Sequence, residues 1–200
     1  MIRVAVLASG TGSNAMKLLH HAKNLTQLCI PLVIVDQKSS LLLETVKNEF
    51  PEVSVQLIEV PQHKSNADRK TIHENEMLAI LKEHKIDWCF LAGYMRLIGP
   101  TLLHAFHDGK KHKIVNIHPS LLPKFPGLHA YEQAYEANEK VSGITIHFVD
   151  KGLDTGPIIA QETFERRSQD SLEDFILRGK QLEWKLYPKI LSQLNEKGDL

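Results

Sequence analysis

The chain has 200 residues, of which 42% are apolar and 24% are charged, a balance typical of a soluble globular protein. We therefore expect a single domain over residues 1–200. The 24 basic and 24 acidic side chains cancel, so the sequence provides no diffuse field to hold a nucleic acid or an anionic membrane surface. Any anion that the protein binds must be held by local geometry.

The N-terminal apolar run, residues 2–8, is too short to cross a membrane and lacks the basic flank and cleavage pattern of a secretory signal. Cys29 and Cys89 lie inside apolar runs typical of buried strands, which indicates reduced core thiols rather than a disulfide or a metal site. Most of the 11 histidines stand singly in polar stretches, without metal-ligand spacing. These features predict a cytoplasmic protein with no metal ion.

Short apolar runs alternate with amphipathic runs over the first half of the chain. Continuous runs rich in Val, Ile and Leu indicate strands buried on both faces, and the amphipathic runs between them indicate helices. This alternation predicts a doubly wound parallel sheet with helices on both faces. The expected strands are residues 2–8, 29–35, 53–60 and 87–93, and the expected helices are residues 14–25, 40–50 and 69–84.

The pattern changes after Gly93. We interpret the triplet ending at Pro100 as the interruption of a helical start. Two later runs indicate antiparallel strands joined across a glycine-rich loop, because apolar and polar residues alternate in the first of them. The fold class is therefore α/β, with a doubly wound, mostly parallel sheet, a C-terminal hairpin and a long terminal helix. The expected elements are a strand at 113–118, a helix at 130–140, hairpin strands at 142–150 and 157–167, and a helix from Ser171 to Leu194.

A glycine-containing loop separates the first strand from the first helix. Gly10 and Gly12 permit a turn with positive φ, and the N–H groups of Ser13 and Asn14 at the helix start are able to surround a phosphate. A tight turn with no ligand needs the same glycines. The pattern of Gly10, Gly12 and an alanine three residues later, followed by an acid at the end of the second strand, also fits a dinucleotide site. An NAD-dependent dehydrogenase is therefore an alternative, although a hydroxyl and an amide suit a phosphate monoester better.

Asn116 and His118 come at the end of the fifth expected strand. Ligands of doubly wound sheets gather beyond the carboxyl ends of the strands, and a spacing of two residues places both side chains on one side. An amide donor and an imidazole are suited to stabilising an oxyanion, and the loop carboxylate of Asp154 could keep the imidazole charged. A strand cap, a turn histidine and a hairpin-turn aspartate remain the structural alternatives.

Four motifs give the chain a family resemblance. The segments "GTGSN", "LAGYMRLIGP", "NIHPSLLPKFPG" and "GITIHFVDKGLDTGPIIAQ" resemble, in order and spacing, those of the phosphoribosylglycinamide formyltransferases, folate-dependent enzymes of purine synthesis with a Rossmann-like fold. The resemblance covers nearly the whole chain. It implies transfer of the formyl group of the co-substrate 10-formyltetrahydrofolate to the amine of N1-(5-phosphoribosyl)glycinamide in de novo purine (IMP) biosynthesis. A formyltetrahydrofolate deformylase is the alternative within the same chemistry.

The resemblance also implies roles for individual residues. It assigns catalysis to Asn116, His118 and Asp154, with Asp154 keeping His118 protonated. It implies a cis peptide bond between Leu122 and Pro123, two small-molecule substrates, and a monomer or homodimer. The implied ribotide-binding residues are Gly12, Ser13, Asn14 and Glu183, and the implied folate-binding residues are Arg69, Met95, Arg96, Leu97, Ile98 and Asn116.

Overall fold

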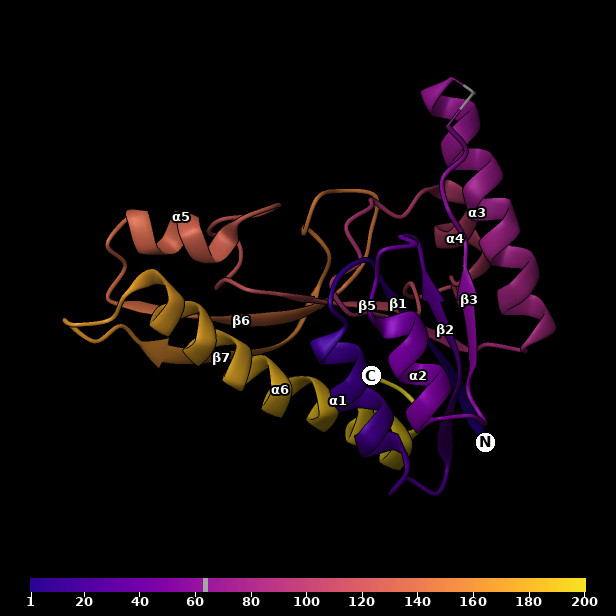
Figure 1. The fold of residues 1–200 in the computed structure, drawn as a ribbon, viewed down its shortest axis with the longest axis horizontal. Helices are drawn as coiled ribbons and strands as arrows, with labels where there is room; N and C mark the ends of the chain where they lie inside the picture. Colours follow the sequence, from indigo (N-terminus) through magenta and orange to yellow (C-terminus); the bar gives the residue numbers. More distant parts are fainter. Residues whose placement is uncertain (63–64) are drawn as a thin grey trace.

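The computed structural model describes residues 1–62 and 65–200, and its strands form one seven-stranded sheet in the order β3-β2-β1-β4-β5-β6-β7 (Figure 1). The first five strands along the chain pair in parallel, whereas β6 is antiparallel to both β5 and β7. The predicted α/β class and the hairpin are therefore confirmed. The strands are β1 (Ile2–Ala8), β2 (Leu28–Val35), β3 (Ser54–Leu57), β4 (Trp88–Leu91), β5 (Ile114–His118), β6 (Val141–Phe148) and β7 (Ile158–Glu165).

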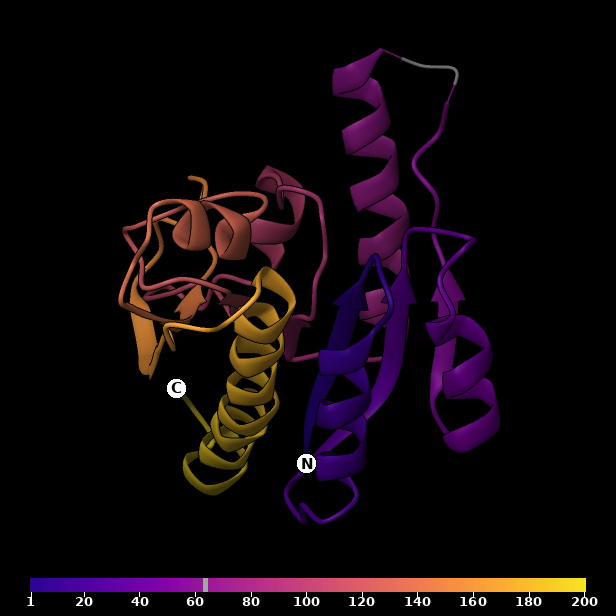
Figure 2. The ribbon, with the colours of Figure 1, turned by 60° about the vertical axis from the view of Figure 1, so that its left-hand side comes forward.

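Helices cover both faces of the sheet, and one of them, α3, also extends beyond it. Residues of α3 and α4 pack against one face of the parallel strands, and residues of α1, α2 and α6 pack against the other. The N-terminal end of α3 extends past the strands in both views (Figures 1 and 2). The helices are α1 (Ser13–Ala22), α2 (Leu42–Glu49), α3 (Asn66–Glu83), α4 (Pro100–Ala105), α5 (Ala130–Glu136) and α6 (Leu172–Lys197).

Strand β1 shows why an uninterrupted apolar run predicts a central strand. Val4 and Val6 belong to the core on the side of α1 and α6, whereas Ala5 and Leu7 belong to the core on the side of α3. Successive side chains of a strand point to opposite faces, so a strand covered on both faces needs an apolar residue at every position.

The long terminal helix α6 is fastened at its start and at its middle. Ser171 and Asp174 form a reciprocal capping box at its N-terminus, which satisfies N–H groups that have no partner within the helix. Farther along, the buried hydroxyl of Tyr187 donates to the carbonyl oxygens of Leu91 and Val115, at 3.0 and 3.1 Å. Helix α6 is thereby tied to β4 and β5, the two strands whose ends carry site residues.

The prediction around Pro100 was wrong. Proline does not interrupt a helix there but occupies the first turn of α4, with Gly99 as the extended N-cap residue. Proline is well suited to the first helical position, because the N–H that it lacks would have no partner within the helix and its φ is already helical.

The two cysteines lie on β2 and β4, which flank β1 on opposite sides, and both are free thiols. The Leu122–Pro123 peptide bond is cis, as the family resemblance implies. None of the described helices has the length and apolar character needed to cross a membrane.

Candidate active site

A cavity of about 670 Å³ opens at the carboxyl ends of the parallel strands. The chain passes from β1 to β2 and β3 on one side of β1 and then crosses to β4 on the other, so the cavity lies where the winding direction of the sheet reverses. This is the position where open α/β sheets bind ligands. The lining residues are 10–14, 91–98, 116–119, 127–129, 147, 149–150, 152–154, 180 and 183.

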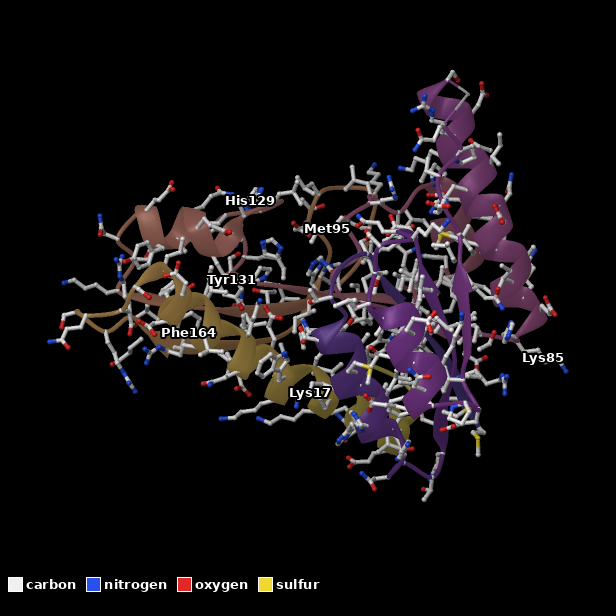
Figure 3. The ribbon with its side chains drawn as sticks, in the orientation of Figure 1. Lys17, Lys85, Met95, His129, Tyr131 and Phe164 are labelled. Carbon is white, nitrogen blue, oxygen red and sulfur yellow. The ribbon has the colours of Figure 1, made fainter. Side chains whose placement is uncertain are left out.

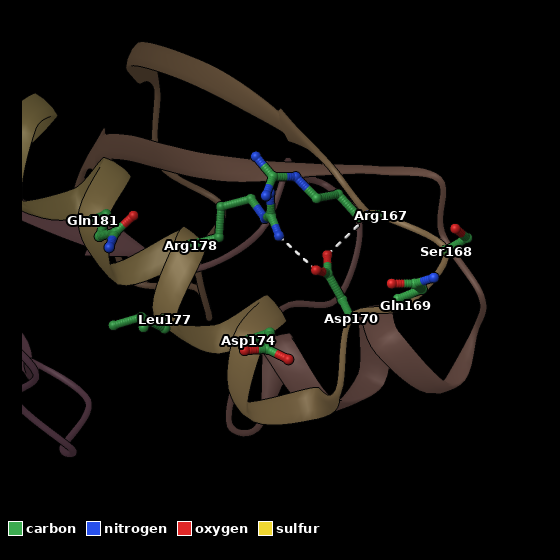
Figure 4. Close-up of a pocket in the computed structure, with 8 residues that line it drawn as sticks. All are labelled: Arg167, Ser168, Gln169, Asp170, Asp174, Leu177, Arg178 and Gln181. Atoms are coloured by element: carbon green, nitrogen blue, oxygen red, sulfur yellow. Dashed lines mark hydrogen bonds and ion pairs between the residues drawn. The ribbon is translucent and has the colours of Figure 1, made fainter.

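A second hollow lies beside the first turns of α6 and is lined largely by polar side chains (Figure 4). The carboxylate in it is already engaged, since Arg178 binds Asp170 at 2.6 Å and the backbone N–H of Arg167 donates to the same carboxylate at 2.8 Å. It lies away from the ends of the parallel strands. We therefore assign the candidate site to the first cavity.

The glycine loop builds one end of the cavity at the start of α1. Gly12 is the N-cap residue with φ of 76°, a left-handed conformation that side chains rarely adopt. A Cβ atom on Gly12 would also come within 2.5 Å of a methyl group of Leu42. The helix start therefore offers backbone N–H groups of Ser13 and Asn14 to the cavity, with no side chain on the N-cap to occupy them.

Glu183 closes the same end of the cavity from α6. Its carboxylate is buried and accepts hydrogen bonds from the Asn14 amide and the Tyr131 hydroxyl, both at 2.5 Å. Burial raises the pKa of Glu183, and these two donors and Lys180 only partly oppose it. The side-chain amide of Asn14 is thus directed to Glu183, so Asn14 has its backbone N–H left for a phosphate.

The contact between Tyr131 and Glu183 depends on a small residue one helical turn earlier. Gly179 faces the Tyr131 ring, and a Cβ there would overlap ring atoms. Close approach of α5 to α6 therefore requires glycine at this position. The sequence analysis singled out neither Tyr131 nor Gly179.

The side chains of Asn116, His118 and Asp154 lie together at the other end of the cavity. The Asp154 carboxylate lies 3.4 Å from Nδ1 of His118 and 3.5 Å from Nδ2 of Asn116. The structure thus brings together the three residues to which the sequence assigned catalysis. Their catalytic roles stay predictions.

Asp154 adopts a left-handed conformation with φ of 54°, which an aspartate tolerates better than most residues. This conformation allows its carboxylate to accept the N–H of Gly127 at 2.8 Å while facing the ends of β5 and β6. Burial pushes the pKa of Asp154 upward. Contact with His147, the Gly127 amide and the charge of His118 outweigh burial, so the pKa lies below its ordinary value.

His118 has a polar partner near each ring nitrogen. Nε2 donates to the carbonyl oxygen of Phe125 at 2.8 Å, while the 3.4 Å from Nδ1 to Asp154 exceeds ordinary hydrogen-bond length. Burial lowers the pKa of His118 and outweighs the Phe125 carbonyl and Asp154, both of which raise it. Asp154 therefore acts in the expected direction, but it does not raise the pKa of His118 above the ordinary 6.5.

His147 is a buried member of this cluster that sequence reasoning missed. It pairs directly with Asn116 across β5 and β6, and its Nε2 lies 3.3 Å from Nδ2 of Asn116 and 3.5 Å from Asp154. Its sequence signal is the alternation of residues 142–148, which places His147 on the same strand face as Thr145. The partner strand and register follow only from the fold.

The loop after β4 supplies the apolar wall. Met95 and Leu97 are 61% and 60% exposed, whereas Ile98 is buried. Met95 on this loop and His129 on the loop before α5 both line the cavity (Figure 3). Two exposed apolar side chains at a cavity mouth are suited to the faces of a flat ring.

Arg96 lines the cavity, but its guanidinium binds the carboxylate of Asp36. The Asp36 side chain is 1% exposed, so it is not available to a ribose. The acid that the dehydrogenase alternative requires thus serves instead to anchor the loop after β4 to the end of β2.

Arg69 is not among the lining residues, and its guanidinium donates to the carbonyl oxygen of Gln62 at 2.7 Å. Its predicted folate contact is not part of the cavity as described. The side chain of Lys70, the next residue along the chain, lies against Gly99. Within residues 1–62 and 65–200, no group of three or more His, Cys, Asp or Glu side chains is arranged to hold a metal ion.

Comparison with known proteins identifies the class of enzyme to which this site belongs. The formyl transferase family matches residues 2–191, so the chain belongs to that family. This confirms the resemblance carried by the four motifs and replaces the dehydrogenase alternative.

Three relatives illustrate the similarity within the family. The chain is 40% identical to "Phosphoribosylglycinamide formyltransferase" of Bacillus subtilis, over 100% of this chain and 99% of the relative. A crystal structure of phosphoribosylglycinamide formyltransferase from Bacillus halodurans is 46% identical, with a TM-score of 0.87 and coverage of 98% and 97% of the two chains. The "Trifunctional purine biosynthetic protein adenosine-3" of Drosophila melanogaster is 37% identical over 96% of this chain, which covers 14% of that protein.

Replacement of Gly12 by alanine tests the helix start. We expect the KM for a ribotide substrate to rise about tenfold or more, because a left-handed residue and a contact with Leu42 would displace the N–H groups. The matched control is Gly10→Ala, where a Cβ would meet open space. Equal effects of the two substitutions in steady-state kinetics would contradict this role.

Glu183→Gln tests the buried carboxylate. Folding raises the pKa of Glu183 above its ordinary value of 4.5, so the folded state binds this proton more tightly than the unfolded state does. The resulting stabilisation is fully present below pH 4.5 and is lost as the pH rises through the pKa of the folded state. The variant should therefore show a flatter dependence of unfolding free energy on pH above 4.5. Urea unfolding at several pH values, with the exposed Glu136→Gln as control, measures this, and parallel curves would contradict it.

Asp154→Asn tests the electrostatic link to His118. The charge of Asp154 raises the pKa of His118, so its removal should lower that pKa further and move the corresponding limb of the kcat profile to lower pH. Asp108→Asn, outside the cavity lining, is the control. A variant profile with the parent midpoint would show that Asp154 does not tune His118.

Proposed function

We propose that the protein transfers the formyl group of 10-formyltetrahydrofolate to the amine of N1-(5-phosphoribosyl)glycinamide in purine biosynthesis. The observation that carries this proposal is the convergence of Asn116, His118 and Asp154 in the same cavity as an open helix start and an apolar wall. The names of the relatives support the choice of substrates.

The ribotide binds at the start of α1. Its phosphate accepts hydrogen bonds from the backbone N–H groups of Gly12, Ser13 and Asn14, where the helix dipole also favours an anion. Glu183 at the same end accepts hydrogen bonds from the ribose hydroxyls with its remaining lone pairs. This orientation directs the glycinamide amine toward the ends of β5 and β6.

The folate binds along the loop after β4. Its flat ring lies against Met95, Leu97 and Ile98, and the backbone of this loop is held in place by the bond of Arg96 to Asp36. The folate carries the one-carbon unit, and the protein supplies orientation and an electric field. Holding two substrates in one cavity lowers the entropic cost of their encounter.

The chemical step joins the amine nitrogen to the formyl carbon. As this bond forms, the electron pair of the carbonyl moves onto the formyl oxygen, and N–H donors preorganised there lower the barrier. Asn116 supplies one donor, and His118 supplies the other once its ring has taken up the proton of the attacking amine. When the bond from the formyl carbon to the folate nitrogen breaks, the folate nitrogen receives a proton and the carbonyl re-forms.

His118 carries the proton between the two nitrogens. Burial lowers the pKa of His118, which favours the neutral ring, and because Nε2 carries the hydrogen that binds Phe125, Nδ1 accepts the proton released by the attacking amine. The resulting imidazolium is stabilised by Asp154 and by the developing oxyanion. It then returns the proton to the departing folate nitrogen.

We also propose that the enzyme acts in the cytoplasm on two small molecules, as a monomer or homodimer and without a metal ion. The balanced charge of the chain supports small-molecule partners over nucleic acid, since no net positive charge attracts a phosphate backbone.

The proposed reaction is tested by incubation of the protein with 10-formyltetrahydrofolate and N1-(5-phosphoribosyl)glycinamide. We expect loss of the formyl-folate absorbance in step with formation of the formylated ribotide. Release of formate without the ribotide would instead identify a deformylase.

His118→Ala provides the matched test of the chemistry. Loss of one oxyanion donor typically costs about 2.7–4 kcal/mol, so turnover should fall about a hundredfold or more while folate binding stays nearly unchanged. His112→Ala, whose ring bonds a backbone carbonyl outside the cavity lining, is the control. Unchanged turnover of the His118 variant would remove His118 from the mechanism.

A further inference from the structure

The ring of His147 has its proton assigned by its backbone contact. Nδ1 lies 2.8 Å from the carbonyl oxygen of Phe148, and because a carbonyl oxygen only accepts, Nδ1 must carry a hydrogen. In the neutral ring Nε2 therefore presents a lone pair. This lone pair faces Nδ2 of Asn116 at 3.3 Å, so His147 accepts an N–H from Asn116.

The same carboxamide nitrogen faces Asp154, and this contact favours the orientation in which the Asn116 amide nitrogen points at both neighbours. Nδ2 of Asn116 lies 3.5 Å from Oδ1 of Asp154, and the opposite orientation would place two acceptor oxygens against each other. Both neighbours of Nδ2, the imidazole lone pair and the carboxylate, are acceptors. Neither competes with Asn116 as a donor.

Nδ2 of Asn116, Nε2 of His147 and Oδ1 of Asp154 form a nearly equilateral triangle, with sides of 3.3, 3.5 and 3.5 Å. Seen from Nδ2, the two acceptors are therefore separated by about 60°, whereas the two N–H bonds of a planar carboxamide diverge by about 120°. One N–H points between the two acceptors. The other must point out of the triangle.

We propose that His147 is a positioning residue that acts through Asn116: together with Asp154 it holds one N–H of the carboxamide and thereby directs the second N–H at the formyl oxygen. This inference rests on the proposed function, because it presupposes that Asn116 is an oxyanion donor. It requires the neutral ring, since a protonated Nε2 has no lone pair to accept from Asn116 and would instead donate to Asp154, 3.5 Å away. His147 itself touches neither substrate in this role.

Two substitutions of similar size distinguish the roles of the two ring nitrogens. Glutamine at 147 can place its amide oxygen near the position of Nε2, which keeps the acceptor for Asn116. Asparagine is shorter, and its amide can replace Nδ1 at the Phe148 carbonyl but does not reach Asn116. We expect His147→Asn to lower kcat about tenfold to a hundredfold, with both KM values within about threefold, and His147→Gln to recover most of kcat.

A double-mutant cycle with Asn116→Ala shows whether His147 acts through Asn116. If it does, adding His147→Asn to Asn116→Ala should lower kcat no further, because the group that it positions is already absent. His112→Asn is the matched control, since the His112 ring also bonds a backbone carbonyl through Nδ1, at 2.9 Å, outside the cavity lining. Thermal unfolding of each variant reports separately on folding.

The outcomes distinguish the inference from the proposed function. Full turnover of Asn116→Ala would overturn the donor role of Asn116 and the inference with it. Impaired Asn116→Ala with fully active His147→Asn would overturn the inference alone. Additive losses in the double variant, or equal losses in His147→Asn and His147→Gln, would also overturn it, because His147 would then act by another route.

Discussion

The carboxylate of Asp154 joins segments that approach one another only in the folded protein. It accepts the N–H of Gly127 from the loop before α5, and it faces His118 and Asn116 on β5 and His147 on β6. A carboxylate that is only 11% exposed is stable only when such partners replace its hydration. The arrangement of this end of the cavity therefore depends on one charge whose removal would leave its partners without a common acceptor.

The sheet topology makes this convergence possible. Parallel strands deliver the glycine loop and the apolar loop to the same edge of the sheet, because their carboxyl ends coincide. Strand β6 then runs antiparallel to β5, so His147 comes opposite Asn116 and the chain continues directly into the loop that carries Asp154. The change from parallel to antiparallel pairing thus separates the end of the cavity with the open helix start from the end with Asn116, His118 and Asp154.

The opposite end of the cavity is organised by a second buried carboxylate. Glu183 joins Asn14 on α1 and Tyr131 on α5, and the approach of α5 depends on Gly179. The two ends differ electrostatically, since burial raises the pKa of Glu183 whereas the partners of Asp154 lower its pKa. Asp154 is thus available as a counter-ion for an imidazolium, while Glu183 acts chiefly through hydrogen bonds.

The amino-acid sequence by itself determined the order of the strands and of the helices other than α4, the hairpin, and the two loops that carry Gly12 and Asp154. These properties are readable because hydrophobic periodicity and turn chemistry act between residues close in the chain. Only the tertiary structure decided that His147 contacts Asn116 and that Arg96 forms an ion pair with Asp36. It also decided that the effect of burial on the pKa of His118 is larger than the effect of Asp154. Each of these depends on register, distance or exclusion of water between segments remote in sequence, and local patterns carry no information about them.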